Sequence, residues 1–161
     1  MSEWTVYLSG EIHTDWREQI IEGAIKNNLP IIFTSAITDH DASDAAGDCL
    51  GKESENFWRD HKSSKVNSIR TKTLIEKSDL VVIRFGDKYK QWNAAFDAGY
   101  CAALGKPYIT LHDDDIIHPL KEVNSMASAR AQSVEWLDEH FPQLDARGRL
   151  EALNYNWGAS E

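Results

Sequence analysis

Short apolar runs alternate with longer amphipathic segments along the whole sequence, and this alternation constrains the fold more than any other feature. β-branched and aromatic runs, typical of buried strands, occupy 4–10, 30–35, 79–87, 106–112 and, more weakly, 126–132. Segments with helical spacing lie between or after them, at 16–25, 66–79, 93–104 and 133–141, and Thr14 or Asp15 is expected to cap the first. The pattern predicts an open, mainly parallel sheet with helices on both faces.

One connection is unusually long and polar. Residues 36–65 are rich in Asp and carry only scattered apolar side chains. A connection of this length inside a compact domain is expected to be functional or partly helical, and 54–61 supplies a candidate short helix. By contrast, 113–125, which includes Asp113–Asp115, is predicted to be a solvated loop.

Composition and charge narrow the function classes. A chain of 161 residues with 42% apolar and 27% charged residues predicts one domain over 1–161. A net charge of −9 disfavours nucleic-acid polymers as partners. With no apolar run of about 18 residues and no leader-like start, we expect a cytoplasmic protein without membrane association. Cys49 and Cys101 share no motif and are predicted to be free thiols.

In open parallel sheets, ligands bind beyond the carboxyl ends of the strands. The rule selects the loops 9–14, 35–48 and 86–93. Their candidate site residues, with those beside them, are Tyr7, Ser9, Gly10, Glu11, His13, His40, Gly86, Asp87, Trp92 and Asn93. Gly10 is expected to allow a positive φ or close approach of a ligand.

Several of these residues have a second interpretation that the sequence leaves open. Tyr7 either contacts substrate or belongs to the core, and His13 and His40 either hydrogen-bond a ligand or are simply exposed. Trp92 either stacks on a base or packs against the helix start. Arg70 either holds a phosphate or carboxylate or forms a surface ion pair.

Cofactor and metal motifs are missing from the sequence. There is no GxGxxG, no GxxxxGK[ST] and no GxSxG. The acidic stretch 39–48 lacks the spacing and the final Glu of an EF-hand loop. We therefore predict neither a cofactor nor a bound metal.

Two stretches together resemble a known superfamily. "VYLSGEIHTDWREQI" and "SDLVVIRFGDKYKQWNAAFDAGYCAALGKPYITL" are similar to nucleoside 2-deoxyribosyltransferase-like proteins, and most closely to the YtoQ family. The resemblance implies a flavodoxin-like fold, a nucleoside or nucleotide ligand and a homo-oligomer. It also implies that Asp97, in the acid position before Gly99, is the nucleophile that attacks the anomeric carbon.

The chain departs from the superfamily pattern at three positions. The nucleophile is Glu in the superfamily but Asp97 here, and two further acidic positions fall on Thr71 and Gln91. Because a misplacement of about 1 Å can cost on the order of a hundredfold in rate, the fold transfers more safely than the activity.

The position of Asp97 in its helix suggests how it would work. It lies within the first two turns, where the helix dipole is expected to favour the ionised, nucleophilic form. Alternatively, Asp97 has no catalytic role and its charge merely complements the helix dipole. Asn93 and Tyr100 share its face and are expected to steer it by hydrogen bonds. Glu11 or Asp87 is the predicted proton partner, although Glu11 alternatively supplies a charge at a helix start.

The predicted function is cleavage or exchange of an N-glycosidic bond through a carboxylate nucleophile. The alternative is a binding module of the same fold whose catalytic site has been altered. A purely structural role is the third interpretation, and it would require that no pocket exist at the strand ends.

Overall fold

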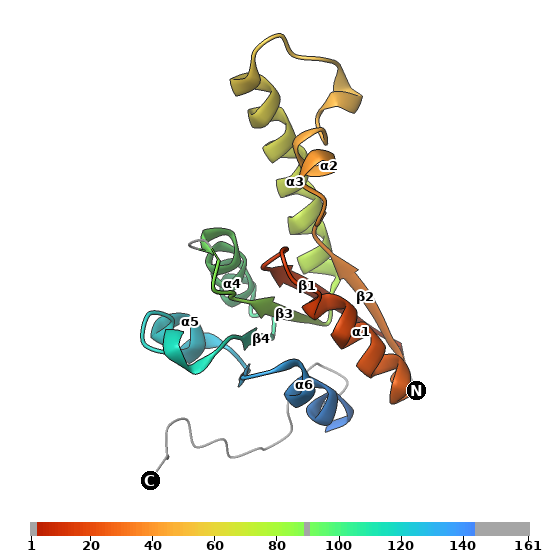
Figure 1. Cartoon of the computed structure of the whole chain (residues 1–161), viewed down its shortest axis with the longest axis vertical. Coiled ribbons are helices and arrows are strands. Elements are labelled where there is room, and N and C mark those ends of the chain that lie inside the picture. The colour runs from red at the N-terminus through yellow and green to blue at the C-terminus, as the bar shows by residue number, and fades with distance from the viewer. Residues whose placement is uncertain (1–2, 89–90, 144–161) are drawn as a thin grey trace.

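A five-stranded parallel sheet with the strand order β2-β1-β3-β4-β5 forms the centre of the molecule (Figure 1). The structure is a computed structural model that describes residues 3–88 and 91–143. Every pair of neighbouring strands runs parallel. The strands are β1 (Trp4–Gly10), β2 (Ile31–Ser35), β3 (Leu80–Arg84), β4 (Tyr108–Leu111) and β5 (Ala129–Ala131). The predicted open parallel sheet is confirmed.

Helices lie between successive strands, and the last helix follows β5. They are α1 (Trp16–Lys26), α2 (His40–Asp44), α3 (Asn56–Lys77), α4 (Trp92–Leu104), α5 (Lys121–Met126) and α6 (Val134–His140). Short 3₁₀ helices lie at Asp48–Leu50, Asp114–Ile116 and Phe141–Gln143. No helix in the described part of the chain is long and apolar enough to cross a membrane.

The two faces of the sheet bury two separate apolar clusters, because successive strand residues point to opposite sides. Val6 and Leu8 of β1 point toward α1 and α6, where they join Trp16, Ile20 and Leu137. Tyr7 of β1 points to the other face, which is covered by the end of α3 and by α4 and α5. Ser9 therefore emerges on the same side as α4.

Three local expectations were wrong. The segments 54–61 and 66–79, predicted as separate helices, form the single helix α3. The predicted loop 113–125 contains most of α5, and Met126, assigned to the last strand, ends that helix. Asp15 occupies the N-cap of α1, but its side chain makes no capping bond, and the Thr14 hydroxyl bonds to Glu11 instead.

The strand order places a topological switch between β1 and β3. From β1 the chain crosses to β2 through α1 on one face and returns through α3 on the other, so the loops after β1 and β3 diverge.

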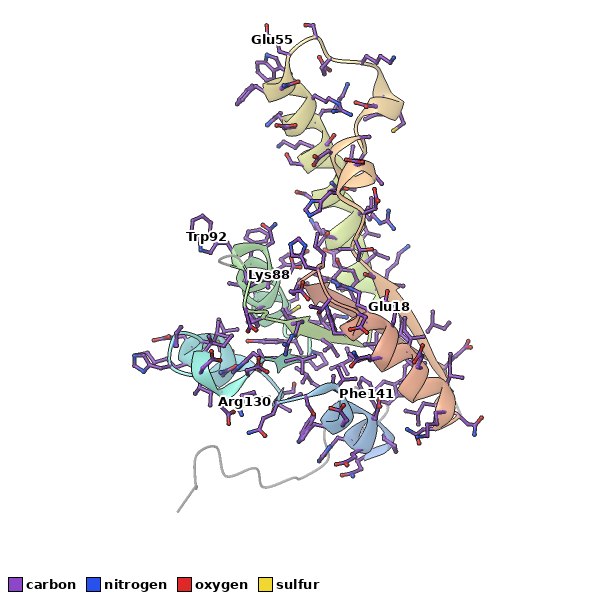
Figure 2. All side chains as sticks on the ribbon, viewed as in Figure 1. Glu18, Glu55, Lys88, Trp92, Arg130 and Phe141 are labelled. Atoms are coloured by element: carbon purple, nitrogen blue, oxygen red, sulfur yellow. The ribbon has the colours of Figure 1, made fainter. Side chains whose placement is uncertain are left out.

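The first part of α3, with α2, extends well beyond the sheet (Figure 1). We call residues 36–67 the arm; Glu55 marks its tip in Figure 2.

Other predictions are settled by local contacts. Cys49 is exposed, Cys101 is buried, and both are free, as predicted. Asp113 and Asp114 are exposed, as expected of a solvated turn, yet both form ion pairs: Asp113 with Arg84 at 3.8 Å and Asp114 with Arg130 at 2.6 Å. The C-terminal tail from residue 144 lies outside the described residues.

Candidate active site

An open cleft of about 1020 Å³ lies at the switch point, between α3 and α4. Its size is at the upper end of the range usual for small-molecule pockets. The end of β1 and the loop after it line the cleft with residues 10–13, and α3 lines it with a row of polar residues. The start of α4 lines it with residues 91–94, Phe96, Asp97 and Tyr100. A cleft therefore exists where the sequence predicted one.

Asp97 lies where α4 passes over the end of β1. Ala94, Ala98 and Cys101 of α4 pack into the core, whereas the half-buried Asp97 faces the cleft. The Ser9 hydroxyl donates a hydrogen bond of 2.5 Å to Asp97 Oδ2. An acid can therefore occupy this position in an otherwise apolar helix, because a polar strand end and the cleft are the surfaces it meets.

The environment raises the pKa of Asp97. Burial, which disfavours the charged form, is the larger influence, and the hydrogen bond from Ser9 lowers the pKa only in part. The expectation that the helix dipole would favour the ionised form is wrong in direction. Asp97 is the sixth residue of α4, whereas the effect of the dipole fades within the first turn.

Tyr7 combines the two roles between which the sequence could not decide. Its ring is fully buried in the core, yet the residue also lines the cleft. Within the described residues its hydroxyl has no hydrogen-bond partner, although Thr71 lies close enough to lower its pKa. Burial is the larger influence, and the pKa of Tyr7 is raised overall. A buried hydroxyl left without a partner is a group available to a ligand.

The expected steering of Asp97 from its own helix is replaced by steering from β1. Tyr100 donates its hydroxyl to Glu76 of α3 at 2.5 Å, and this bond is the main cause that raises the pKa of Tyr100 to about 12. Tyr100 thus ties α4 to α3. Asn93 is exposed and lines the cleft.

Glu11 differs from Asp97 in its environment. Burial raises its pKa, but hydrogen bonds from the Thr14 hydroxyl, at 2.6 Å, and from the backbone N–H of His13 outweigh burial and lower the pKa overall. Its backbone carbonyl accepts from Trp16 Nε1 at 2.8 Å and from the Arg17 guanidinium. The Glu11 carboxylate therefore holds the loop after β1 in shape by accepting hydrogen bonds from within it.

Two glycines allow this loop to form. Gly10 has a φ of 98°, as predicted, and an added Cβ would lie 2.1 Å from the Arg84 carbonyl oxygen. Gly10 thus allows its own backbone to lie close to the backbone of β3. A Cβ on Gly86 would lie 2.4 Å from Glu11 Cγ, so Gly86 makes room for the Glu11 side chain.

The remaining predicted residues divide between the cleft and its surroundings. His13, Arg70 and Trp92 line the cleft, and Trp92 projects from the start of α4 with 73% of its surface exposed (Figure 2). His40 is not a lining residue but stacks on His13 with ring centroids 5.4 Å apart. Gly86 and the exposed Asp87 do not line the cleft either.

Sequence reasoning missed the wall that α3 contributes. Ser64, Asn67 and Thr71 all line the cleft and follow one another at intervals of three and four residues, and Ser68 lies beside them. This stripe of hydroxyl and amide groups at helical spacing was present in the sequence, but splitting α3 into two segments concealed it. Thr71 and Gln91, the two neutral residues at acidic superfamily positions, both line the cleft.

Within residues 3–88 and 91–143, no group of three or more His, Cys, Asp or Glu side chains could hold a metal ion.

The parallel sheet and the cleft at its switch point define a flavodoxin-like α/β protein, and comparison with solved structures supports that fold. A conserved protein from Enterococcus faecalis V583 superposes with a TM-score of 0.61 at 15% identity, covering 88% of this chain and 99% of that one. The 2-deoxyribosyltransferase from Bacillus psychrosaccharolyticus superposes with a TM-score of 0.54 at 15% identity, covering 83% of this chain and 90% of that one. At this identity the likeness concerns the fold.

Sequence comparison defines the family. Residues 7–139 match the family described as nucleoside 2-deoxyribosyltransferase YtoQ. The uncharacterized protein YtoQ of Bacillus subtilis (strain 168) is 43% identical over 133 residues, which cover 82% of this chain and 90% of that protein. The chain belongs to the YtoQ family, as the resemblance indicated.

Proposed function

We propose that the protein is an enzyme that cleaves or exchanges the N-glycosidic bond of a nucleoside or nucleotide, with Asp97 as nucleophile. The observation that carries the proposal is the half-buried Asp97 carboxylate, which faces the cleft and is held by Ser9 at 2.5 Å. A carboxylate fixed in this way can attack an anomeric carbon and form a covalent glycosyl intermediate.

The reaction has two displacements. In the first, Oδ1 of the ionised Asp97 bonds to C1′ of the sugar while Ser9 holds Oδ2. The N-glycosidic bond breaks, and its electron pair leaves with the base, which takes a proton from water. In the second, a free base or water attacks C1′, its proton passes to solvent, and the bond to Asp97 breaks to regenerate the carboxylate.

Water is the proton source we favour, because the two predicted partners are poorly suited. The lowered pKa of Glu11 and its hydrogen bonds to its own loop favour the ionised form, which has no proton to give. Asp87 is exposed and is not a lining residue. Glu11 then has a positioning role, because it shapes the loop that borders the cleft.

A binding module is the second candidate, and two observations favour it. The raised pKa of Asp97 reduces the fraction that is ionised, and Thr71 and Gln91 leave the cleft without two carboxylates of the superfamily pattern. Such a protein would bind the same compounds without breaking the bond.

An exchange assay separates the candidates. Purified protein is incubated with 2′-deoxynucleosides, ribonucleosides and their monophosphates, each with a second free base, and released or exchanged base is measured by chromatography. We expect turnover that is lost in Asp97→Asn and retained in Asp87→Asn, the matched carboxylate control outside the cleft lining. Tight binding without turnover would support the binding module, and equal turnover in Asp97→Asn would refute the nucleophile.

The proposal extends to assembly and location. We propose one domain over 1–161 and a cytoplasmic homo-oligomer. The arm exposes Leu50, Phe57 and Trp58 by 69%, 68% and 53%, and apolar surface of this kind is often covered by a partner. Light scattering of the purified protein measures the oligomeric state, and a monomer at all concentrations would contradict this part of the proposal.

A further inference from the structure

Arg70 is a cation in the cleft to which the proposed chemistry gives no role. It is exposed on α3 and lines the cleft. Within residues 3–88 and 91–143 the other four arginines are engaged: Arg17 with backbone carbonyls, Arg59 with Asp48, Arg84 with Asp113 and Arg130 with Asp114. Arg70 has no hydrogen bond or ion pair in the same residues, so the surface ion pair that the sequence left open is not formed.

The wall around Arg70 is polar where a helix facing a protein body is normally apolar. At 100° per residue, Asn67 and Thr71 lie near the centre of the cleft-facing stripe, with Arg70 on one side of it and Lys72 on the other. Lys72 is only loosely held, at 3.9 Å from Glu76. Arg70, on its flank of this stripe of hydroxyl and amide groups, therefore makes the wall suited to an anionic ligand.

The acidic residues of this wall do not neutralise Arg70. Asp60 precedes it by ten residues, about 15 Å along the helix axis. Asp44 is held near Ser63, whose hydroxyl donates to the Asp44 carbonyl at 2.6 Å. Both carboxylates act on Arg59, at the far end of the arm. On the wall opposite Asp97, the acidic side chains therefore lie toward the arm tip and the basic ones toward the sheet.

Tyr7 connects the basic part of the wall to Asp97. Its buried hydroxyl, which has no hydrogen-bond partner among the described residues, is most strongly affected by burial, and it also senses the charges of Asp97, Arg17 and Arg70. Thr71, the neighbour of Arg70, lies beside the same hydroxyl. A sugar whose C1′ is at Asp97 would thus have Tyr7 beside its ring and Arg70 beyond it.

We propose that Arg70 binds the 5′-phosphate of the substrate, so that this cleft takes nucleoside 5′-monophosphates in preference to nucleosides. The inference rests on the proposed function, because the sugar is oriented by its attack at Asp97. Planar guanidinium groups bind phosphate through two parallel hydrogen bonds, which fixes the position as well as the charge of the ligand.

Calorimetric titration tests the assignment. Wild-type protein and the Asp97→Asn variant are titrated with the four 2′-deoxynucleosides, their 5′-monophosphates, ribose 5-phosphate and inorganic phosphate. The best monophosphate is expected to bind at least about tenfold more tightly than its nucleoside, and added salt should weaken the monophosphate alone. Inorganic phosphate should bind far more weakly than either.

The matched variants are Arg70→Gln and Arg59→Gln, which remove the same charged group from the same helix inside and outside the cleft. Arg70→Gln should weaken the monophosphate by about 10- to 100-fold and leave the nucleoside unchanged. Arg59→Gln should change neither affinity. Arg70→Lys, which keeps the positive charge, should retain part of the preference for the monophosphate over the nucleoside. Thermal unfolding of each variant verifies that it is folded.

Four results would overturn the inference: equal affinity for nucleoside and monophosphate, equal weakening of both in Arg70→Gln, inorganic phosphate binding as tightly as the monophosphate, or no binding by any compound. Failure of the chemistry gives a different result. Monophosphates bound through Arg70 but never cleaved would refute the N-glycosidic reaction and leave the phosphate site standing. If nucleosides were cleaved as fast as monophosphates, the N-glycosidic reaction would stand and the phosphate site would be refuted.

Discussion

The two walls of the cleft are built on different physical principles. The α4 and β1 wall is part of the core: Ala94, Ala98 and Cys101 are buried, and Asp97 is set among them. On the 22-residue α3, only Ser63 and Ile75 are buried, and Phe57 and Ile69 are each 68% exposed. A tightly packed wall can fix a reacting group, whereas a solvated wall can adapt to the outer parts of a ligand.

The arm is held mainly by polar contacts. Ser63 bonds to the carbonyl of Asp44 at 2.6 Å and to the N–H of Gly47 at 3.1 Å, Asn67 donates to Ser43 at 3.1 Å, and Arg59 pairs with Asp48 at 2.8 Å. Such contacts contribute about 1 kcal/mol each, and less where they are exposed. The arm should therefore open more readily than the sheet, and its amides should exchange faster.

The largest expected effect is on the packed wall. Asp97→Asn should lower turnover by at least about a thousandfold, because the neutral amide cannot act as the nucleophile. Its stability should be equal or higher, since the raised pKa of Asp97 means that ionisation of the buried carboxylate opposes folding as the pH rises. Chromatographic turnover and thermal unfolding are the measurements. Loss of activity together with a loss of stability would show instead that Asp97 has a structural role.

Glycine substitutions compare the backbones of the two regions. Gly10→Ala should cost about 3 kcal/mol or more, because its φ is positive and the new Cβ would meet the Arg84 carbonyl oxygen at 2.1 Å. Gly51→Ala, at a positive φ of 112° on the arm, has no described neighbour within 4 Å and should cost less, about 2 kcal/mol from backbone strain alone. Urea unfolding measures both. Equal costs would mean that the arm is as rigidly packed as the sheet.

Removing the hydroxyl that holds the nucleophile should change the pH profile. Turnover requires ionised Asp97, so it should fall as the pH drops through the raised pKa. Ser9→Ala removes the hydrogen bond that lowers this pKa, so the acidic limb should move to higher pH, and turnover at neutral pH should fall by about tenfold. Ser125→Ala, on the exposed surface of α5, is the control. An unmoved acidic limb in Ser9→Ala would contradict the assignment.

Glu11→Gln tests the loop that joins the sheet to the cleft. The lowered pKa of Glu11 means that its contribution to stability is present above its unfolded pKa and is lost as the pH falls through its folded pKa. The variant should lose about 1 kcal/mol at neutral pH and differ less from wild type in acid. Urea unfolding at several pH values measures this. A constant difference would mean that the carboxylate charge is not responsible.

The smallest effect is expected at the arm tip. Phe57→Ser should change the stability of the monomer by less than about 0.5 kcal/mol, because the ring is 68% exposed. If the proposed oligomer covers this surface, the variant should instead dissociate at higher concentrations than wild type, which light scattering detects. Thermal unfolding should be compared at concentrations where both proteins are monomeric.

The strands were predictable because their signal is local. Runs such as 79–87 consist of residues that favour strands and are bounded by turn residues, and β3 formed within that run. The helix α3 was only partly predicted, because residues 62–65 are all polar. They were therefore interpreted as a break between two helices. A polar helix of this kind gives no periodic apolar signal, because so much of it faces solvent or the cleft.

The positions of the candidate site residues were predicted better than their states. Asp97, Glu11 and Tyr7 all line the cleft, because the switch-point rule depends only on strand order. The pKa directions of Asp97 and Glu11 depend on which donors reach each carboxylate, namely Ser9 for the first and Thr14 with His13 for the second. Ser9 and Asp97 are 88 residues apart, so no local pattern could pair them.

By itself, the sequence determined the alternation of strands and helices, the edge of the sheet at which a ligand would bind and the acid on α4 that faces that edge, because each follows from local periodicity and the fixed geometry of parallel sheets. Only the tertiary structure decided that α3 is continuous and that, among the residues the structure describes, Tyr7 keeps an unpaired hydroxyl and Arg70 is left without a carboxylate. These facts depend on distances between residues far apart in the chain, and such distances exist only once the chain has packed.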